Sequence, residues 1–468
     1  MTLVLGLDIG STSTKAVLVD VRNGVRLVHA ARRSTPDDVD ALIAATAAAT
    51  RECLTHADTP VVAVGIAAMA ESGAALDASG RPITPLLRWD RGVDRRHLQR
   101  LLDRDPQLPA RTGVPATTKP AAVTLIALRA ERPDMFAALH HWSGVAEIIA
   151  HALTGSRATD LTLAARTMLL TDDGWNEALL RDLGLAPSAL APIRVPGERA
   201  GRTGPMAAVF GLPPGVPVHV VGHDHAVGAW AVGARVAGDV ADSLGTSEAV
   251  VRITDTVDQA RAVTEGFAVS RTIDGSAVTV LGGNPSCGAL LADEERRRPG
   301  TLRLLRGIDA DAWEASPMTV LPYPSGRQCP QPDPTARLRV IGEGDESDRA
   351  RAVLQSLVLQ ARWIRESIDD LAGSPAASLT VLGSLADRYE CWAPLIASAG
   401  VPTRQSVALE PVAAGAALRA AVVEGIASPE VTLPVRVVTP ASGPGLDEAF
   451  HRFLTAARAV SVLPEGES

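Results

Sequence analysis

The sequence has few cysteines and lacks long apolar runs, and each shortage excludes a class of protein. The four cysteines, Cys53, Cys287, Cys329 and Cys391, are far apart and form no CxxC pair, which argues against a zinc site and against a disulfide framework. No run of 18 apolar residues occurs, and no basic segment leads into an apolar core at the N-terminus. We therefore expect a cytoplasmic protein without a membrane segment.

The chain also has a deficit of positive charge. Lysine is almost absent, and 45 Lys and Arg residues stand against 53 Asp and Glu residues, for a net charge of −8. Basic clusters such as Arg95 with Arg96 are short, so the charge pattern does not indicate nucleic-acid binding. A content of 46% hydrophobic and 21% charged residues in 468 is typical of a globular protein of two or three domains.

What the chain does contain is one pattern that occurs twice, in residues 3–20 (LVLGLDIGSTSTKAVLVD) and 240–253 (VADSLGTSEAVVRI). Each stretch has an apolar run, a glycine among serines and threonines, and a second run with apolar alternation. This is typical of two strands joined by a tight turn. The glycines of the two copies, Gly10 and Gly245, are separated by half the length of the chain. The repeat predicts two related halves that each open with a hairpin.

The composition of these turns indicates phosphate binding. A glycine lets the backbone turn with its N–H groups exposed, and neighbouring hydroxyls add donors. Asp8, at the end of the first strand, suits a magnesium ion, often through water. Glycine, serine and threonine populate turns of every kind. Here, however, the pattern occurs twice at half-chain spacing, and only the first copy has the carboxylate. This arrangement favours two turns that together hold one nucleoside triphosphate.

The opening hairpin, an expected helix at 37–56 and an expected buried strand at 61–67 together predict an α/β domain. The stretch 70–92 follows this strand. Glu71 comes directly after the strand, where open α/β sheets place ligand groups. The ring of Trp89 could pack against the C–H surface of a sugar while a carboxylate accepts hydrogen bonds from its hydroxyls. Taken alone, Trp89 is more often a core residue.

Asp224 stands in GHDHAVG, between an expected strand at 213–221 and a small-residue helix. Phosphoryl transfer to a hydroxyl needs a carboxylate that takes the proton, and Asp224 is our candidate. The alternative is a transition-metal site. Neighbouring residues on an extended chain point to opposite sides, so we expect His223 and Asp224 not to converge on one ion, whereas His223 and His225 could. A structural role for His223 and a substrate contact for His225 stay open.

Further helices are expected at 120–155, 349–371 and 411–424, and a strand at 379–382. The last residues, 464–468, are the one stretch expected to lack order.

Several motifs together resemble those of a known family. They are LDIGSTSTK, RWDR, LTGSRATD, GHDHAVGAWAVGA, DSLGTSE, PYPSGRQCP and VLGSLADRYECW followed by EPVAAGAALRAA. In this order and spacing, over nearly the whole chain, they resemble the FGGY family of carbohydrate kinases, within the actin, Hsp70 and hexokinase-like superfamily. The resemblance implies an α/β fold of two RNase H-like (actin-like ATPase) domains with a catalytic cleft between them, residues 1–236 binding the sugar and 237–468 most of the nucleotide.

The resemblance also implies roles for particular residues. It makes Asp224 the catalytic base, Asp8 and Asp224 the metal residues, and ATP with Mg²⁺ the cofactors. The substrate would contact Glu71, Trp89, Asp224 and His225. The nucleotide would contact the two turns and two later glycine segments, namely Gly10, Ser11, Thr12, Ser13, Lys15, Gly245, Thr246, Ser247, Gly282, Gly283, Gly383 and Ser384.

Two departures from the family pattern bear on specificity. Gly383-Ser384-Leu385 stands where the family usually has a Gly-Gly-Ala-type run, which leaves the adenine contact open. Glycerol kinase-like members also have a glutamate at the position of Glu71, but in those members an arginine precedes it, and here it does not. This difference leaves the identity of the substrate open.

The predicted function is ATP-dependent phosphorylation of a hydroxyl of a sugar or polyol. The expected partner is that small molecule, with neither nucleic acid nor a membrane, and a homodimer is left open. The alternative is a non-catalytic relative that senses a sugar or nucleotide. A third interpretation is an actin- or Hsp70-like ATPase that acts on proteins. Such a protein would have the same hairpins, but this interpretation does not explain the presence of Glu71, Trp89 and Asp224.

Overall fold

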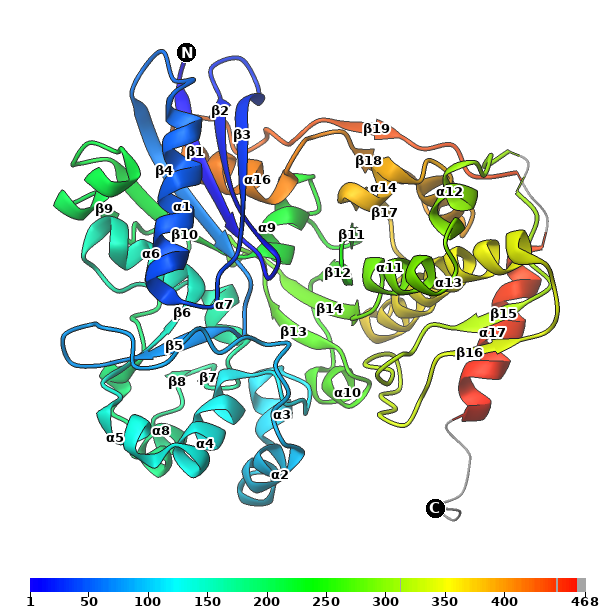
Figure 1. Cartoon of the computed structure of the whole chain (residues 1–468), viewed down its shortest axis with the longest axis horizontal. Helices are drawn as coiled ribbons and strands as arrows, with labels where there is room; N and C mark the ends of the chain where they lie inside the picture. The colour runs from blue at the N-terminus through cyan, green and yellow to red at the C-terminus, as the bar shows by residue number, and fades with distance from the viewer. Residues whose placement is uncertain (312, 443–444, 461–468) are drawn as a thin grey trace. The chain divides into compact units, whose positions relative to one another are not determined.

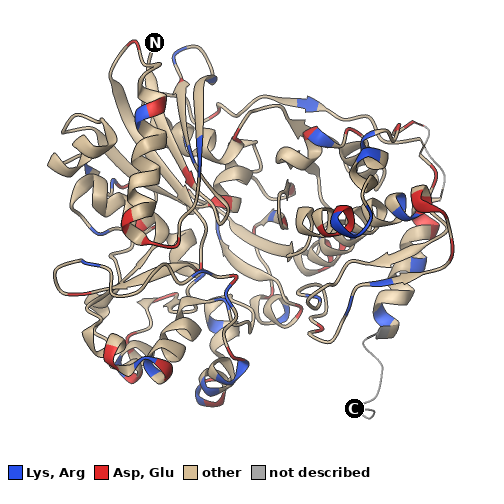
Figure 2. Ribbon diagram, in the orientation of Figure 1, with Lys and Arg blue, Asp and Glu red and all other residues tan. Residues whose placement is uncertain are grey.

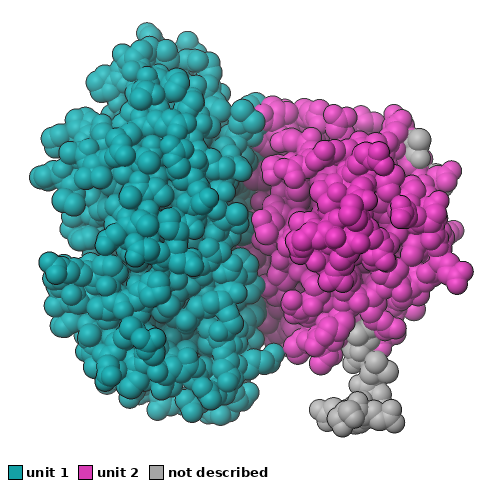
Figure 3. Space-filling model, in the orientation of Figure 1, with its two compact units in different colours: residues 1–233, 269–278, 408–434 teal, residues 234–268, 279–407, 435–468 magenta. Residues whose placement is uncertain are grey.

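The structure, a computed structural model, describes residues 1–311, 313–442 and 445–460. The expectation for residues 464–468 therefore lies outside the described residues. The chain forms two compact units (Figure 3), with residues 1–233, 269–278 and 408–434 in unit 1 and the remainder in unit 2. The main division at 233/234 lies close to the expected one, but two later stretches of the chain belong to unit 1. Among the described residues, none of the helices combines the length and apolar character needed to cross a bilayer.

Unit 1 is built on a mixed sheet in which an antiparallel meander continues into parallel strands (Figure 1). The first strand pairs antiparallel with the second and parallel with the fourth, which itself pairs parallel with the tenth. The sheet order is β3 (Arg26–Ser34), β2 (Ser13–Asp20), β1 (Leu3–Ile9), β4 (Val61–Ala68), β10 (Pro217–His223) and β9 (Gly201–Arg202). The predicted opening hairpin and the strand after the first helix are confirmed.

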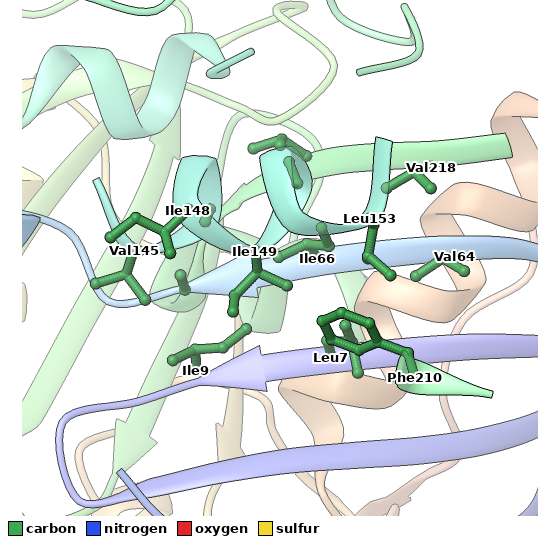
Figure 4. Packing of buried hydrophobic residues seen from close by; sticks show 14 of the residues in the cluster. Leu7, Ile9, Val64, Ile66, Val145, Ile148, Ile149, Leu153, Phe210 and Val218 are labelled. Carbon is green, nitrogen blue, oxygen red and sulfur yellow. The ribbon is translucent and has the colours of Figure 1, made fainter. Parts of the chain in front are cut away.

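Helices cover both faces of this sheet because successive strand residues point to opposite sides. On one face, Leu7 and Ile9 of β1 pack with Ile149 and Leu153 of α6 (Val145–Thr154), as Figure 4 shows. Helix α1 (Val39–Leu54) covers the same face. On the other face, Val4 and Val17 pack against α9 (Asp224–Ala231) and α16 (Pro411–Val423).

The remainder of unit 1 is mostly helical, and one prediction about it is wrong. Residues 120–155 are not one helix, because Pro133 starts a new helix and β6 (His141–Gly144) is extended and pairs with β5 (Gly73–Leu76). The other elements are α2 (Arg95–Arg104), α3 (Leu108–Thr112), α4 (Ala121–Glu131), α5 (Pro133–Ala138), α7 (Leu161–Ala165), β7 (Leu170–Thr171), β8 (Gly174–Trp175), α8 (Glu177–Leu183) and short 3-10 turns at Pro187–Ala189 and Pro205–Phe210.

The sheet of unit 2 repeats the arrangement found in unit 1. Its first strand again pairs antiparallel with the next strand and parallel with a later one. Within the unit the order is β14 (Val278–Asn284), β12 (Glu248–Thr254), β11 (Asp239–Leu244), β17 (Ser378–Leu382), β18 (Thr403–Ser406) and β19 (Val435–Val437). The expected repeat is seen in the ends of β1 and β11, at Ile9 and Leu244, each directly before the glycine of its turn.

The long helix predicted at 349–371 is confirmed as α13 (Glu346–Ala372). It starts at a capping box formed by Asp345 and Asp348, and acidic and basic residues both occur along it (Figure 2). It packs with α17 (Leu446–Val460) through Trp363 and Phe453. Unit 2 also contains α10 (Gln259–Thr264), α11 (Gly288–Arg297), α12 (Thr301–Arg306), β15 (Thr319–Leu321), β16 (Arg339–Ile341), α14 (Ser384–Arg388) and α15 (Trp392–Ala397), while β13 (Ala268–Arg271) lies where the chain passes into unit 1.

Two glycines let α16 approach the sheet of unit 1 unusually closely. A Cβ atom added to Gly6 would overlap the carbonyl oxygen of Ala413, and one added to Gly65 would overlap that of Ala416. Both obstacles are backbone atoms of a packed helix, which cannot move aside like a flexible side chain. The approach matters for function because the first residue before α16 is Glu410.

We predict that Gly6→Ala or Gly65→Ala destabilises unit 1 by about 1–3 kcal/mol or more, because the new methyl group forces α16 away from the sheet. The melting temperature should fall by several degrees, measured by circular dichroism. Gly92→Ala is the control, since a Cβ atom there meets nothing within 4 Å. An unchanged melting temperature in both test variants would contradict the close approach.

Candidate active site

The first glycine turn joins β1 and β2 and presents polar groups to solvent. The Gly10 N–H donates to the Ser13 carbonyl oxygen (3.1 Å), and the Thr35 hydroxyl donates to the Gly10 carbonyl oxygen (2.7 Å). Thr12 is exposed, and Ser11 is partly exposed. The turn predicted from the sequence therefore exists, with its hydroxyl-bearing residues accessible.

A lysine at the base of this turn bridges two carboxylates. Lys15 lies opposite Asp8 in the hairpin, and its Nζ is 3.0 Å from Asp8 Oδ2 and 3.0 Å from Glu410 Oε2. Arg32 holds the other oxygen of Glu410 at 2.6 Å. Although burial alone would lower the pKa of Lys15, Asp8 and Glu410 raise it above its usual value, so Lys15 is a cation. Glu410 was missed by the sequence reasoning, which used the EPVAAG segment as a family motif and an expected helix but named no site residue in it.

Asp8 keeps one carboxylate oxygen without a partner. Asp8 is 3% exposed, and its Oδ1 has no hydrogen-bond partner among the described residues. Burial raises the pKa of Asp8, Lys15 opposes that rise, and the charge of Asp224 adds to it. Asp8 and Asp224 are thus close enough to interact electrostatically. A buried oxygen of this kind beside a second carboxylate fits a bound hard cation.

Asp224 is the first residue of α9, directly after β10. Its Oδ1 accepts a hydrogen bond from the His225 N–H (2.7 Å) and lies 3.1 Å from His223 Nε2 and 3.9 Å from His225 Nε2. Loss of water around the carboxyl raises its pKa, but His225, His223 and Lys15 together lower it below the usual value. Asp224 is therefore ionised at neutral pH.

The expectation that His223 and Asp224 would not converge is wrong. The chain changes from strand to helix between them, so the alternation of an extended chain ends at His223. One ligand atom from each of His223, Asp224 and His225 lies within 4.8 Å of the other two. Burial lowers the pKa of His223 to about 3, which makes its ring neutral at physiological pH.

Glu71 and Trp89 come from the segment that follows β4. Glu71 adopts a positive φ of 63°, and its Oε1 accepts a hydrogen bond from Arg166 Nη2 (2.7 Å). The Trp89 backbone N–H donates to Ser72 Oγ (3.1 Å), and Lys119 Nζ lies 4.9 Å from the Trp89 ring centre. Trp89 is only partly buried and packs against the hydrophobic core of unit 1. Arg166 was also missed, because arginine after a short helix has no distinctive pattern.

The second turn, in unit 2, closes over an even shorter span. The Gly245 N–H donates to the Ser247 carbonyl oxygen (2.9 Å), and Thr246 is exposed at the tip. The backbone N–H groups of Gly288 and Ala289 donate to the carbonyl oxygens of Gly245 and Thr246. The start of α11 therefore braces this turn.

The later glycine segments occupy different environments within unit 2. Gly383 has a φ of 106°, and a Cβ atom there would overlap the carbonyl oxygen of Leu244, so the segment with Ser384 lies against the end of β11 beside the Gly245 turn. A Cβ atom at Gly282 would lie 2.6 Å from Ile364, and packing accounts for that glycine. The Gly283 N–H donates to Cys329 Sγ (3.2 Å).

A pair of buried carboxyl groups flanks the second turn. Asp242 and Glu248 are each 1% exposed, and burial raises the pKa of Asp242 to about 7 and that of Glu248 well above its usual value. Neither residue was predicted to be functional. Burial thus disfavours the charged forms of both carboxyls, in contrast to Asp224 of unit 1, whose pKa is lowered.

Comparisons with known proteins place these features in a family. The sequence matches the FGGY family of carbohydrate kinases, N-terminal domain, over residues 3–231 and the C-terminal domain of the same family over residues 240–424. Among solved structures, a xyloylose kinase from Brucella ovis aligns with a TM-score of 0.86 at 23% identity, covering 99% of this chain and 100% of that one. A xylulose kinase from Lactobacillus acidophilus aligns with a TM-score of 0.85 at 19% identity and 99% coverage of both chains.

Curated relatives are similar over shorter stretches. An L-fuculokinase of Escherichia coli is 26% identical over 255 residues, which cover 50% of this chain and 53% of that protein. A gluconokinase of Bacillus subtilis is 25% identical over 269 residues, 54% of this chain and 52% of that protein. The chain thus spans about half the length of the first curated relatives it matches. A xylulose kinase of Escherichia coli is 26% identical over 354 residues, 73% and 71% of the two chains.

The two related mixed sheets, each opening with a glycine-turn hairpin, define a protein of the actin-like ATPase fold, as the sequence predicted. With family matches over both regions, the chain belongs to the FGGY family of carbohydrate kinases.

The start of α7 allows a test of electrostatics near Asp224. Asp160 is the N-cap of this helix and accepts hydrogen bonds from the backbone N–H groups of Thr162 and Leu163 (2.9 Å each). Burial nevertheless raises its pKa from 3.8 to about 6. The folded protein therefore binds this proton more tightly than the unfolded chain, so the stabilisation is complete below pH 3.8 and is lost as the pH rises through about 6.

We predict that the free energy of unfolding of the native protein, relative to that of Asp160→Asn, falls by about 3 kcal/mol between pH 4 and pH 7, since two pKa units correspond to about that amount. Denaturant unfolding at pH 4, 5.5 and 7 measures the difference. Asp38→Asn is the matched control, because Asp38 caps α1 at an exposed position. The same trend in both variants would contradict the effect of burial.

Proposed function

We propose that the chain is an ATP-dependent carbohydrate kinase that transfers the terminal phosphoryl group of ATP to a hydroxyl of a sugar or polyol. The observation that carries this proposal is the ionised carboxylate of Asp224 at the start of α9, within electrostatic reach of Asp8 and Lys15. A carboxylate base, a cation site and a phosphate-binding turn are the groups that phosphoryl transfer to an alcohol requires.

Asp224 acts as general base in this proposal. Its Oδ1 is held by the His225 N–H, which leaves Oδ2 to accept the proton of the attacking hydroxyl. The proton moves to Oδ2 as the hydroxyl oxygen bonds to the γ-phosphorus and the bond to the β-phosphate oxygen breaks. His223 Nε2 lies 3.1 Å from Asp224 Oδ1, so the imidazole ring helps to orient the carboxylate.

The glycine turn of each unit is a proposed phosphate-binding element. In unit 1 the donors are the backbone and hydroxyl groups of Gly10, Ser11, Thr12 and Ser13. Lys15 forms ion pairs with both Asp8 and Glu410 beneath them. In unit 2 the proposed contacts are those of the second turn and of the two glycine segments, Gly245, Thr246, Ser247, Gly282, Gly283, Gly383 and Ser384.

Asp8 and Asp224 would hold the magnesium ion, with Asp8 Oδ1 as the oxygen that lacks a partner among the described residues. When bound, magnesium neutralises negative charge on the phosphate oxygens. The substrate would lie against Glu71, Trp89 and His225. The relatives' names suggest a ketose or a sugar acid as the compound to test first.

We predict that Asp224→Ala lowers the rate of sugar-dependent ADP release by about 10²- to 10⁴-fold, because the attacking hydroxyl loses its base. A coupled ADP assay with pentuloses, hexuloses, polyols and sugar acids measures the rate. Asp58→Ala, at an exposed position in the loop before β4, is the control. Unchanged turnover in Asp224→Ala would refute the assignment, and sugar binding without any phosphorylated product would favour the sensor alternative.

We predict that Asp8→Asn raises the half-saturating magnesium concentration by about 10- to 100-fold, since the metal loses a charged partner. A magnesium titration of both initial rates and nucleotide binding measures this shift. Asp20→Asn, which removes an ion-paired carboxylate at the far end of the same hairpin, should leave the titration unchanged. Equal shifts in the two variants would indicate a general effect on the hairpin.

A further inference from the structure

Glu71 is held in an unusual backbone conformation after β4. It is one of four non-glycine residues with positive φ in the described part of the chain. Such a conformation costs on the order of 1–3 kcal/mol and persists only where the surroundings fix it. The Glu71 side chain is 9% exposed. The strain indicates that the position of this carboxylate is specified by its neighbours.

The neighbour that fixes Glu71 is Arg166. Its Nη2 donates to Glu71 Oε1 at 2.7 Å, and its own side chain is 11% exposed. Arg166 binds Glu71 through Oε1, which leaves Oε2 outside this ion pair, and among the described residues Arg166 Nε and Nη1 are buried without a partner. A nearly buried ion pair in which two guanidinium nitrogens lack hydrogen-bond partners contributes little to the stability of the fold. Its geometry is better explained by a polar ligand than by folding.

Arg166 also connects Glu71 to the region of Asp224. It directly follows α7, whose other end is fixed by Asp160. Within α7, the Thr162 hydroxyl accepts a hydrogen bond from the His223 N–H (2.8 Å), and a Cβ atom on Gly222 would lie 2.5 Å from that hydroxyl. The positive charge of Arg166 also contributes to the lowered pKa of His223. One short helix therefore relates the positions of Glu71 and Asp224.

We propose that Arg166 is a positioning residue that holds Glu71 so that Oε2 accepts a hydrogen bond from a substrate hydroxyl, and that the substrate is an uncharged ketose or polyol. This inference rests on the proposed function. Glu71 neutralises Arg166, so the pair offers no net positive charge to a substrate carboxylate. The carboxylates of Glu71 and Asp224 repel a sugar acid, while uncharged hydroxyls can donate to Glu71.

The test compares Arg166→Met, Arg166→Lys and Glu71→Gln with the native protein. We expect Arg166→Met to raise KM for the best ketose or polyol at least tenfold, with kcat changed less than threefold and KM for ATP unchanged. Arg166→Lys keeps the charge but not the planar fork, so it should show an intermediate KM. Arg194→Met removes an exposed arginine–glutamate pair elsewhere in unit 1 and should leave all constants unchanged.

The substrate class is tested with the native protein on D-xylulose, L-fuculose, glycerol and D-gluconate. We expect kcat/KM for gluconate to be at least 100-fold below that for the best uncharged compound. Lys119, near Trp89, is the cation that a sugar acid would use, so a preference for gluconate would overturn the class.

Calorimetric titration with the same four compounds separates this inference from the proposed function. A KM for the sugar within twofold of native in Arg166→Met, with Asp224→Ala inactive, overturns the role of Arg166 and leaves the kinase assignment intact. If no compound yields a phosphorylated product, the kinase proposal fails, and weaker binding of the uncharged compounds to Arg166→Met would still support the positioning role. If Arg166→Met does not fold, as judged by its melting curve, the Arg166→Lys constants decide.

Discussion

The candidate site depends on keeping three carboxylates together in a region with little water. Asp8, Asp224 and Glu410 share this region with one ammonium group, that of Lys15. Burial opposes the ionised form of each acid, and like charges oppose it further. Lys15 and Arg32 keep the pKa of Glu410 low, whereas the pKa of Asp8 remains raised. The charge of Asp224 and the unpartnered carboxylate oxygen of Asp8 among the described residues make the region attractive to a cation.

This arrangement depends in turn on a backbone contact far along the chain. Glu410 precedes α16 and adopts a φ of 49°, so its carboxylate reaches Lys15 only if the helix lies against β1 and β4. Gly6 and Gly65 permit that approach. The site therefore combines residues near position 10, near 224 and at 410. Residues 408–434 belong to unit 1 because α16 packs against the sheet of that unit.

The sequence predicted the parts of this design that have a local pattern. The hairpins, the strand at β4, the helix α13 and the two-unit fold follow from apolar periodicity, turn composition and the repeat, which are properties of neighbouring residues. Arg166 and Glu410 could not be found in this way, because their roles depend on partners, Glu71 and Lys15, that are distant in the sequence. The helix expected over 120–155 is interrupted for a similar reason, since β6 is extended by pairing with β5, a strand from a much earlier part of the chain.

The two hairpins also differ in a way that their similar patterns conceal. In unit 2 the position matching Asp8 is Ser243, and the acidic residue lies one place earlier, at Asp242. Because strand residues alternate between faces, that shift puts the carboxyl on the other side of the sheet, where it is buried with Glu248 and its pKa is about 7. Burial therefore disfavours the charged form of this carboxyl, whereas the pKa of Asp224 is lowered. The repeated hairpin thus provides similar backbone turns in both units, while the ionised carboxylates of the candidate site are concentrated in unit 1.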